Sequence, residues 1–310
     1  MLGIVILNYK NYGDVFPCVE SIRKTIGAVE YKIYVVDNNS PNESHVKLLE
    51  RYHEDEDVEV IQSGVNGGFS AGNNVGFRRA IEEGCDALLC TNSDVEFYEN
   101  AIKIMLDRLW SEEKLAVVGP KVYNPGDKVQ DCNKGLLTPA TFVFRRRGLR
   151  VFDWFGLEKK YSYKKYDYSK PLYPKGMVSG CCFLVRADVL QEVGYLDENV
   201  FLYQEEDILG AKLRKLGYKV ILDPKAEILH YGEKSTGGTS PFTHYHKFFS
   251  GLYYLWRYSE CSRLGFSIAC FFTKSLMWIY AIKHKEYWQY YKRLKSDIRN
   301  LKKAERGFNP

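Results

Sequence analysis

Four positions with acidic or imidazole side chains follow or adjoin short apolar runs that are typical of buried strands. Asp37 ends one such run, Asp94 lies just beyond another, His230 ends a third, and residues 205–207 read Glu-Glu-Asp at a predicted helix start. Carboxylate and imidazole groups serve as ligands of divalent metals and as general bases. Because ligands of α/β proteins bind at the carboxyl ends of strands, the four positions together indicate a single site.

Each of these positions also has a purely structural interpretation. Asp37 would then cap the following helix or form an Asx turn. The acids at 205–207 would complement a helix dipole, a contribution of ~0.3–1 kcal/mol each. His230 would be an ordinary core or surface histidine. Taken alone, each position fits this interpretation better, whereas four strand-end positions together favour the site.

A glycine-rich segment, Asn66–Phe77, precedes a predicted helix and reads NGGFSAGNNVGF. Its glycines allow another chain or a ligand to approach the backbone closely, and the helix amides are able to face a phosphate. The segment is neither a GxGxxG fingerprint nor a P-loop, because no Lys-Ser/Thr pair follows. Dinucleotide dehydrogenase and NTPase functions therefore lose support.

Short apolar runs alternate with segments of helical spacing over the first 120 residues. The runs predict buried strands at 3–7, 33–36, 58–61, 87–90 and 116–118. The intervening segments predict helices at 13–27, 43–53, 70–83 and 98–110. This alternation predicts a doubly wound α/β layer with a mostly parallel, Rossmann-like sheet.

The pattern is less regular from 120 to 176, which we interpret as a variable excursion on the acceptor side of the site, partly loop. Ordered segments are predicted beyond it: strands at 177–185, near 218–222 and at 227–230, and helices at 187–193 and 205–216. From 242 the composition becomes aromatic and basic. We therefore expect an α/β domain over 1–241 and a helical region over 242–310.

Composition excludes several classes of protein. Hydrophobic residues make up 45% of the chain and charged residues 27%, so a folded core is expected. The eight cysteines form no CxxC pair, which is typical of reduced thiols and argues against a zinc module. The chain begins almost directly with a strand-like run, so we do not expect a secretory signal.

The positive charge is confined to the C-terminal part of the chain. Residues 283–306 carry nine Lys or Arg and three acidic residues, which leaves the rest of the chain at about −1 of the total of +5. A nucleic-acid-binding core is therefore not expected.

The segment 264–282 is apolar except for Lys274 near its middle, which makes a membrane span marginal. Aromatic residues interleave with basic ones on both sides of it. The pattern favours a helix lying on an anionic membrane surface. A packing or dimer helix, with a homo-oligomer as its consequence, and a true span are the alternatives.

Six segments in colinear order make the chain resemble family-2 glycosyltransferases of the GT-A fold, in the rhamnosyltransferase-like and galactofuranosyltransferase-like subset. The similarity covers about residues 3–235, and it lies in the segments Ile4–Tyr9, Val35–Ser40, Asn66–Phe77, Thr91–Glu96, Val178–Glu198 and Phe201–Val220. These motifs are specific for the family and the fold, and they do not specify the sugar. No QxxRW motif of the processive members is present, so a processive synthase is not expected.

The resemblance implies roles for residues at matching positions. Asp94 matches the last acid of the metal-binding DxD motif, whose first acid is missing because Asn92 stands at that position. His230 matches a histidine that completes the shell of Mn²⁺ or Mg²⁺. Glu206 matches the catalytic base, and its neighbour Asp207 is the rival for that role. The positions implied to bind nucleotide or sugar are Asn8, Tyr9, Asp37, Asn39, Asn66, Gly67, Gly68, Phe69, Gly72, Asn73, Asn74, Asn92 and Ser93, and those implied to bind the acceptor are Gly180 and Cys181.

The chemistry implied is an inverting transfer of one sugar from a nucleotide-diphosphate donor, linked to dTDP or UDP, to a lipid-linked glycan. A metal would neutralise the leaving diphosphate while one carboxylate deprotonates the acceptor hydroxyl. The corresponding location is cytoplasmic, peripheral on the inner face of the plasma membrane. The alternatives are a sugar nucleotidylyltransferase, which would need a Gly-rich basic signature that residues 8–16 lack, and a non-catalytic membrane-bound scaffold.

Overall fold

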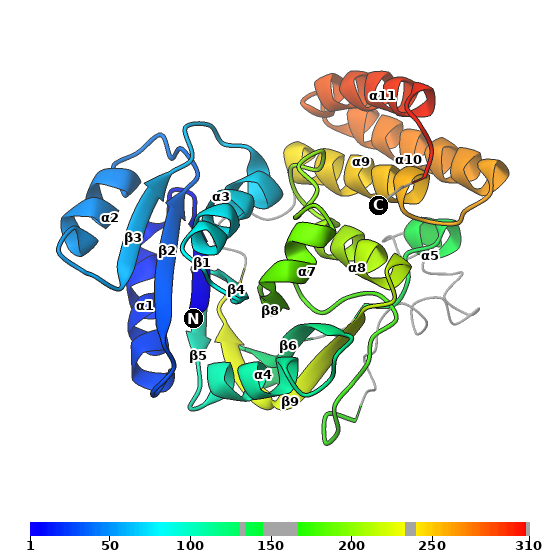
Figure 1. Ribbon diagram of the computed structural model, residues 1–310. Coiled ribbons are helices and arrows are strands. Elements are labelled where there is room, and N and C mark those ends of the chain that lie inside the picture. Colours follow the sequence, from blue (N-terminus) through cyan, green and yellow to red (C-terminus); the bar gives the residue numbers. More distant parts are fainter. Residues whose placement is uncertain (131–133, 145–166, 233–239, 308–310) are drawn as a thin grey trace.

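The computed structural model describes residues 1–130, 134–144, 167–232 and 240–307, and Figure 1 shows how their elements are arranged. The described strands are β1 (Leu2–Asn8), β2 (Tyr31–Asp37), β3 (Val58–Gln62), β4 (Ala87–Asn92), β5 (Val95–Phe97), β6 (Leu115–Asn124), β7 (Lys128–Val129), β8 (Cys182–Arg186) and β9 (Lys219–His230). The described helices are α1 (Tyr12–Thr25), α2 (Ser44–Tyr52), α3 (Gly68–Glu82), α4 (Ala101–Leu109), α5 (Pro139–Phe144), α7 (Ala187–Glu192), α8 (Glu205–Lys215), α9 (Pro241–Arg257), α10 (Arg263–Lys283) and α11 (Tyr287–Lys303).

The described strands form one sheet in the order β3-β2-β1-β4-β8-β6-β9-β5, with β7 paired to β6. The first four strands of this order are parallel, as the strand–helix alternation predicts. Their register pairs Asn8 with Asp37 and Leu7 with Asn92. The carboxyl ends of β1, β2 and β4 therefore meet at one edge of the sheet.

The other half of the sheet is mixed, because β8 runs antiparallel to both β4 and β6. The prediction of a strand over 177–185 is wrong for its first half, since β8 begins only at Cys182. Before that residue, the carbonyl of Met177 accepts a hydrogen bond from the amide of Lys134. The carbonyl of Cys181 likewise accepts one from the amide of Asn92, so this segment lines the carboxyl-end edge.

The two predicted strands at 218–222 and 227–230 are one strand, β9, with an irregularity in the middle. Its register with β6 jumps from Asp223 to Glu227 between two consecutive residues of β6. Pro224 falls in this irregularity, where its missing N–H costs no ladder hydrogen bond. The excursion predicted over 120–176 contributes the end of β6, β7 and α5, and its residues 131–133 and 145–166 lie outside the described residues.

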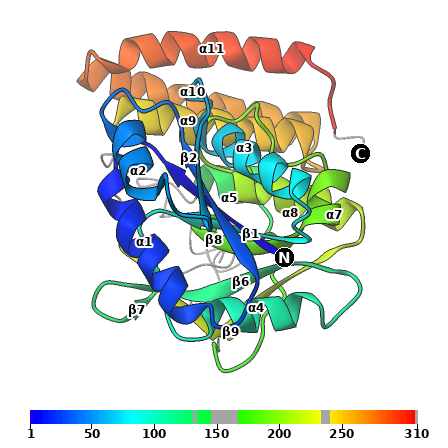
Figure 2. The ribbon, with the colours of Figure 1, turned by 60° about the vertical axis from the view of Figure 1, so that its left-hand side comes forward.

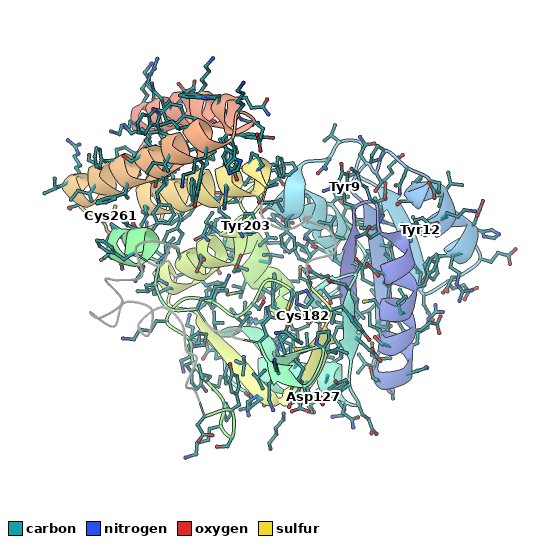
Figure 3. The ribbon with its side chains drawn as sticks, turned by 180° about the vertical axis from the view of Figure 1, so that it is seen from behind. Tyr9, Tyr12, Asp127, Cys182, Tyr203 and Cys261 are labelled. Carbon is teal, nitrogen blue, oxygen red and sulfur yellow. The ribbon has the colours of Figure 1, made fainter. Side chains whose placement is uncertain are left out.

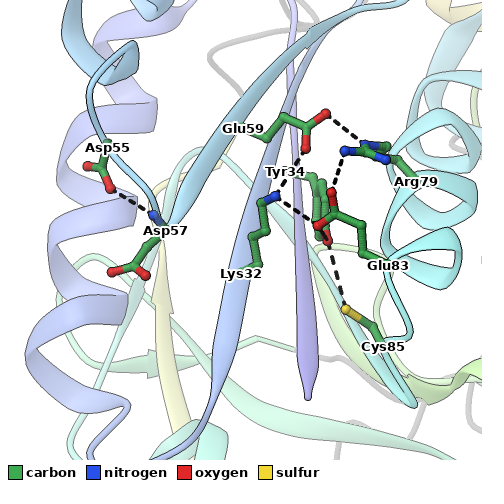
Figure 4. A network of polar contacts seen from close by, with 8 residues as sticks. All are labelled: Lys32, Tyr34, Asp55, Asp57, Glu59, Arg79, Glu83 and Cys85. Carbon is green, nitrogen blue, oxygen red and sulfur yellow. Dashed lines mark hydrogen bonds and ion pairs between the residues drawn. The ribbon is translucent and has the colours of Figure 1, made fainter.

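A network of charged side chains fastens the C-terminal end of α3 to the sheet (Figure 4). Lys32 Nζ on β2 lies 3.3 Å from Glu59 Oε2 on β3 and 2.8 Å from Glu83 Oε2 just beyond α3. Arg79 of α3 forms ion pairs with the same two carboxylates, and the Tyr34 hydroxyl donates to Glu83 at 2.8 Å. The glycine-rich N-terminal end of α3 is thereby held at the carboxyl-end edge.

The helical region predicted beyond residue 242 consists of α9, α10 and α11, which lie side by side at one end of the molecule (Figures 1 and 2). Helix α9 begins at Pro241 behind a capping box, in which Thr243 N donates to Ser240 Oγ at 3.1 Å and Ser240 N donates to Thr243 Oγ1 at 2.8 Å. Ser262 Oγ caps α10 by accepting from Gly265 N at 3.0 Å.

A second apolar core joins these helices to the α/β layer. Buried side chains of the three helices pack with residues from the α5 and α8 regions, namely Leu137, Phe142, Val143, Val200, Ile208 and Ala211. Among the described helices, α10 alone is long and apolar enough to cross a membrane, with a mean hydropathy of 1.4 and 33% of that stretch buried inside the protein. None of the seven described cysteines forms a disulfide.

Candidate active site

A cavity of about 660 Å³ opens at the carboxyl-end edge of the sheet. The ends of β1, β4 and β9, the start of α3, the segment before β8, the start of α8 and the start of α9 all contribute to it. Eleven residues predicted for the site line the cavity: Tyr9, Asn66, Gly68, Phe69, Asn92, Ser93, Asp94, Gly180, Cys181, Glu206 and His230. Figure 3 labels two of the lining residues that are far apart in the sequence, Tyr9 after β1 and Tyr203 before α8.

Asp37 lies behind the lining and is fully buried. Its Oδ1 accepts hydrogen bonds from Asn8 Nδ2 at 2.8 Å and Ser40 Oγ at 2.7 Å, and its Oδ2 accepts one from Ser40 N at 3.0 Å. These bonds fix the turn after β2, where Asn39 adopts a left-handed φ of 52°. Asn8 and Asp37 therefore do not border the cavity, and they support the residues that line it.

Asn38, which sequence analysis does not assign, borders the cavity and connects β2 to the glycine-rich segment. Its Nδ2 donates to Asn66 Oδ1 at 3.0 Å and to the carbonyl of Gly68 at 3.1 Å. Gly68 has φ +86°, and a Cβ at this position would collide with the carbonyl of Phe201. The amide of Phe69 donates to that carbonyl at 2.9 Å, so close backbone packing is what requires this glycine.

The remaining predicted residues at the start of α3 do not border the cavity. Asn73 is buried and donates to the carbonyl of Phe69 at 2.9 Å. Asn74 donates to the carbonyl of Leu196 at 2.9 Å, while Gly67 and Gly72 do not border the cavity. These residues position the lining.

Asp94 and His230 face each other across the neighbouring strand ends. His230 Nε2 lies 3.4 Å from Asp94 Oδ1, and both side chains are largely buried. Burial raises the pKa of Asp94, but the hydrogen bond and charge of His230 outweigh it, so the pKa of Asp94 lies below its ordinary value. The other ring nitrogen, Nδ1, is 3.1 Å from Gln130 Oε1.

This pair fits a divalent cation as part of a larger ligand set. Donation from His230 Nδ1 to Gln130 Oε1 fixes the ring with Nε2 on the side of Asp94, where a bound cation would take the place of the Nε2 proton, as in metal sites with an oriented imidazole. Among the described residues, no group of three or more His, Cys, Asp or Glu side chains forms a complete site. A cation here would take its other ligands from elsewhere, such as phosphate oxygens and water.

The three acids at the start of α8 have different surroundings. Glu206 lines the cavity and forms an ion pair with Lys134. It also lies next to Gly180, since a Cβ added to that glycine would be 3.7 Å from Glu206 Oε2. Asp207 is buried and does not border the cavity. Glu205 is buried at the lining and accepts a hydrogen bond from Tyr203 N at 2.8 Å. Burial raises the pKa of Glu205 to about 6.

An aromatic wall borders the cavity opposite the strand ends, and sequence analysis does not assign it. Phe201 precedes α8 and Phe242 opens α9, and their ring centroids lie 5.7 Å apart at a nearly perpendicular angle. His246 packs against both rings at 5.0 and 4.4 Å, and burial lowers its pKa to about 4, so the ring is neutral at physiological pH. The C-terminal helices thus supply part of the site itself.

The architecture is the GT-A fold of glycosyltransferases, with helices on a mixed sheet. The structure is similar to that of GalNAc-T7 with UDP, GalNAc and Mn²⁺ (TM-score 0.59, 16% identity, 78% of this chain and 45% of the other). It is also similar to the Pyrobaculum calidifontis mannosyltransferase PcManGT in complex with GDP-Man and Mn²⁺ (TM-score 0.52, 11% identity, 96% of this chain and 84% of the other).

The family follows from the sequence match. Residues 3–194 match the profile of "Glycosyl transferase family 2", and the chain belongs to that family, as the six motifs predict. A relative in Haloferax volcanii, the low-salt glycan biosynthesis hexosyltransferase Agl10, is 29% identical over 66% of this chain and 59% of its own length. In Mycobacterium tuberculosis, N-acetylglucosaminyl-diphospho-decaprenol L-rhamnosyltransferase is 26% identical over 66% of this chain and 68% of its own length.

Proposed function

We propose that the protein is an inverting, non-processive glycosyltransferase that transfers one sugar from a UDP- or dTDP-linked donor to a lipid-linked glycan acceptor. The observation that carries this proposal is that one cavity holds both the Asp94–His230 pair and Glu206, a partly exposed lining carboxylate that is ion-paired with Lys134. Family membership supports the reaction class, and the relative that acts on a diphospho-decaprenol glycan supports the acceptor class.

Asp94 and His230 would hold a Mn²⁺ or Mg²⁺ ion together with donor phosphate oxygens. When bound, the ion would supply positive charge to the leaving nucleoside diphosphate. Asn38 and Asn66 offer amide groups on the same side of the cavity, where they are able to orient the donor.

Glu206 would accept the proton of the acceptor hydroxyl. The hydroxyl oxygen then forms a bond to C1 of the sugar, and the bond from C1 to the phosphate oxygen breaks with its electron pair leaving on the diphosphate. One displacement at C1 inverts its configuration. A second nucleophile is not required, so a single carboxylate suffices.

The acceptor would enter beside Glu206, bordered by Gly180, Cys181 and the aromatic wall. Phe201 and Phe242 offer apolar faces against which a sugar ring is able to pack. We place the enzyme on the cytoplasmic side, peripheral to the membrane that carries the acceptor, in surface polysaccharide assembly.

A thermal-shift screen with nucleoside diphosphates and nucleotide sugars, each with and without Mn²⁺, tests the donor side. A ligand at 100 times its Kd should stabilise the protein by ~2.7 kcal/mol, and we expect this for a UDP or dTDP compound only when Mn²⁺ is present. The proposal fails if no nucleotide raises Tm under either condition. The product of any transfer then shows the configuration at C1 by NMR.

A further inference from the structure

Helix α10 carries a stripe of large apolar side chains on its outer face. These six residues, called here the α10 stripe, are Leu264, Ile268, Phe271, Trp278, Ile279 and Ile282, and each is between 41% and 71% exposed. Their spacing keeps them on one side of a helix. The opposite side of α10 is buried in the second core through Phe266, Ala269, Cys270, Thr273, Met277 and Ala281. Packing among the described residues therefore leaves the stripe uncovered.

Helix α11 lies along α10 and presents basic side chains outward. Its inner side packs through Tyr287, Leu294, Ile298 and Leu301. The outer side, called here the α11 basic face, consists of the exposed residues Lys292, Lys295, Arg299, Lys302 and Lys303. Figure 2 shows α11 as the outermost helix at this end of the molecule, beside α10. Two helices in contact with each other thus carry an exposed apolar stripe and an exposed positive face.

We infer that the α10 stripe and the α11 basic face form a docking surface for an anionic lipid bilayer. The inference deepens the proposed function, on which it rests for its purpose, by naming the surface that meets the membrane. Charge complementarity identifies the occupant, because basic side chains beside an exposed apolar stripe match anionic headgroups beside acyl chains. A second copy of the chain would bring the same positive charge to the same face.

The buried side of α10 distinguishes lying on the bilayer from crossing it. A spanning α10 would have to leave α9, α5 and α11, which it contacts along the second core. Lys274, half-buried on the flank of the stripe, would also lie near the bilayer centre. Docking through the stripe alone keeps both the core and the hydration of Lys274.

Co-sedimentation of the full chain with vesicles tests the surface. The vesicles are phosphatidylcholine alone, or phosphatidylcholine with one quarter phosphatidylglycerol by mole, here an order-of-magnitude choice for an anionic leaflet. The wild type should pellet with the anionic vesicles only. Ile268→Ser/Phe271→Ser should abolish pelleting, while the matched pair Val46→Ser/Leu49→Ser, also exposed apolar residues but on α2, should leave it unchanged.

A second pair of variants isolates the charge. Lys292→Glu/Arg299→Glu should weaken binding to anionic vesicles by roughly a hundredfold, whereas Lys47→Glu/Lys103→Glu, with the same change in net charge, should retain it within about threefold. Quenching of tryptophan fluorescence by lipids brominated on the acyl chain should be seen in the wild type and be reduced in Trp278→Phe. All substituted side chains are exposed or half-exposed, so folding should be retained.

The inference is overturned if the wild type ignores anionic vesicles, or if the stripe variant binds them as the wild type does. It is also overturned if light scattering shows a wild-type dimer that the stripe variant converts to monomer without any vesicle binding. Nucleotide binding by the same variants is measured separately, in the thermal-shift screen. A failure of the donor proposal therefore leaves the vesicle result intact, and the reverse also holds.

Discussion

Lys134 and Glu206 form an ion pair that connects the segment before α5 to the first turn of α8. Their side chains are 25% and 13% exposed, so water screens the pair only in part. The pair holds the proposed base at the cavity, next to Gly180. It must open, or share its carboxylate, when Glu206 accepts a proton from the acceptor.

Lys134→Met should destabilise the protein because it leaves the Glu206 carboxylate partly buried without its cation. Glu206→Gln in the same chain should remove most of that penalty, since a neutral amide needs no counter-ion. A double-mutant cycle in urea should therefore give a coupling free energy of ~1–2 kcal/mol. Additive effects of the two substitutions would show that the pair contributes nothing.

The metal prediction concerns Asp94, His230 and Gln130. Asp94→Ala should abolish transfer, and His230→Ala should raise the Mn²⁺ concentration needed for half-maximal activity. Gln130→Leu should weaken Mn²⁺ affinity by ~10-fold or more, because the imidazole loses the partner that orients it. The matched control Gln289→Leu, an exposed glutamine on α11, should change nothing. Full activity of the wild type in chelator would contradict the metal-dependent mechanism.

Glu205 should make stability depend on pH. Its pKa of about 6 in the fold lies above the unfolded value, so the folded state binds the extra proton between roughly pH 4.5 and 6. Stability contributed by the neutral carboxyl is present below pH 4.5 and is lost as pH rises through 6. Glu205→Gln should therefore stabilise the protein by ~2 kcal/mol at pH 7.5 and by little at pH 4. An equal shift of Tm at both pH values would contradict this.

Asp197 connects the α/β layer to the end of α9. Its Oδ2 accepts hydrogen bonds from the hydroxyls of Tyr253 at 3.0 Å and Tyr258 at 2.5 Å. Burial raises the pKa of Asp197, but these bonds and those from Asn199 outweigh it and lower the pKa. Tyr258→Phe should cost ~1.5–3 kcal/mol, as expected for a hydrogen bond to a charged group.

The control for this change is Tyr218→Phe, whose hydroxyl donates to Glu192 at an exposed site at 2.6 Å. We expect this substitution to cost less than ~1 kcal/mol, because water replaces the lost partner. Thermal unfolding of both variants gives the comparison. Equal losses would mean that the contact with Asp197 has no special weight in holding the C-terminal helices.

The parallel half of the fold was predictable from sequence because each apolar run there encodes its own strand. The same local pattern places Asp94 and His230 at strand ends, which is why the sequence predicts that both belong to one site. It did not extend to the antiparallel β8, whose predicted start at 177 was wrong, because an apolar run does not reveal that Met177 bonds to Lys134 instead of a neighbouring strand.

The residues missed at the site come from segments far apart in the chain. Lys134, Gln130 and Phe242 lie in stretches without a motif. Only tertiary packing brings Phe242 to the cavity, and Lys134 and Gln130 to the lining residues Glu206 and His230. The choice between Glu206 and Asp207 likewise depended on motif register, whereas the structure distinguishes them by position: Glu206 borders the cavity and Asp207 does not.

The most direct test of the central claim compares Glu206→Gln with Asp207→Asn in a transfer assay, once the thermal-shift screen has identified a donor. Glu206→Gln should keep donor binding, measured as an unchanged Tm shift, and lower turnover by ~10²–10⁴-fold, the usual range for loss of a general base. Asp207→Asn should lose far less turnover. A mild Glu206→Gln together with an inactive but donor-binding Asp207→Asn would contradict the assignment of Glu206 as the base.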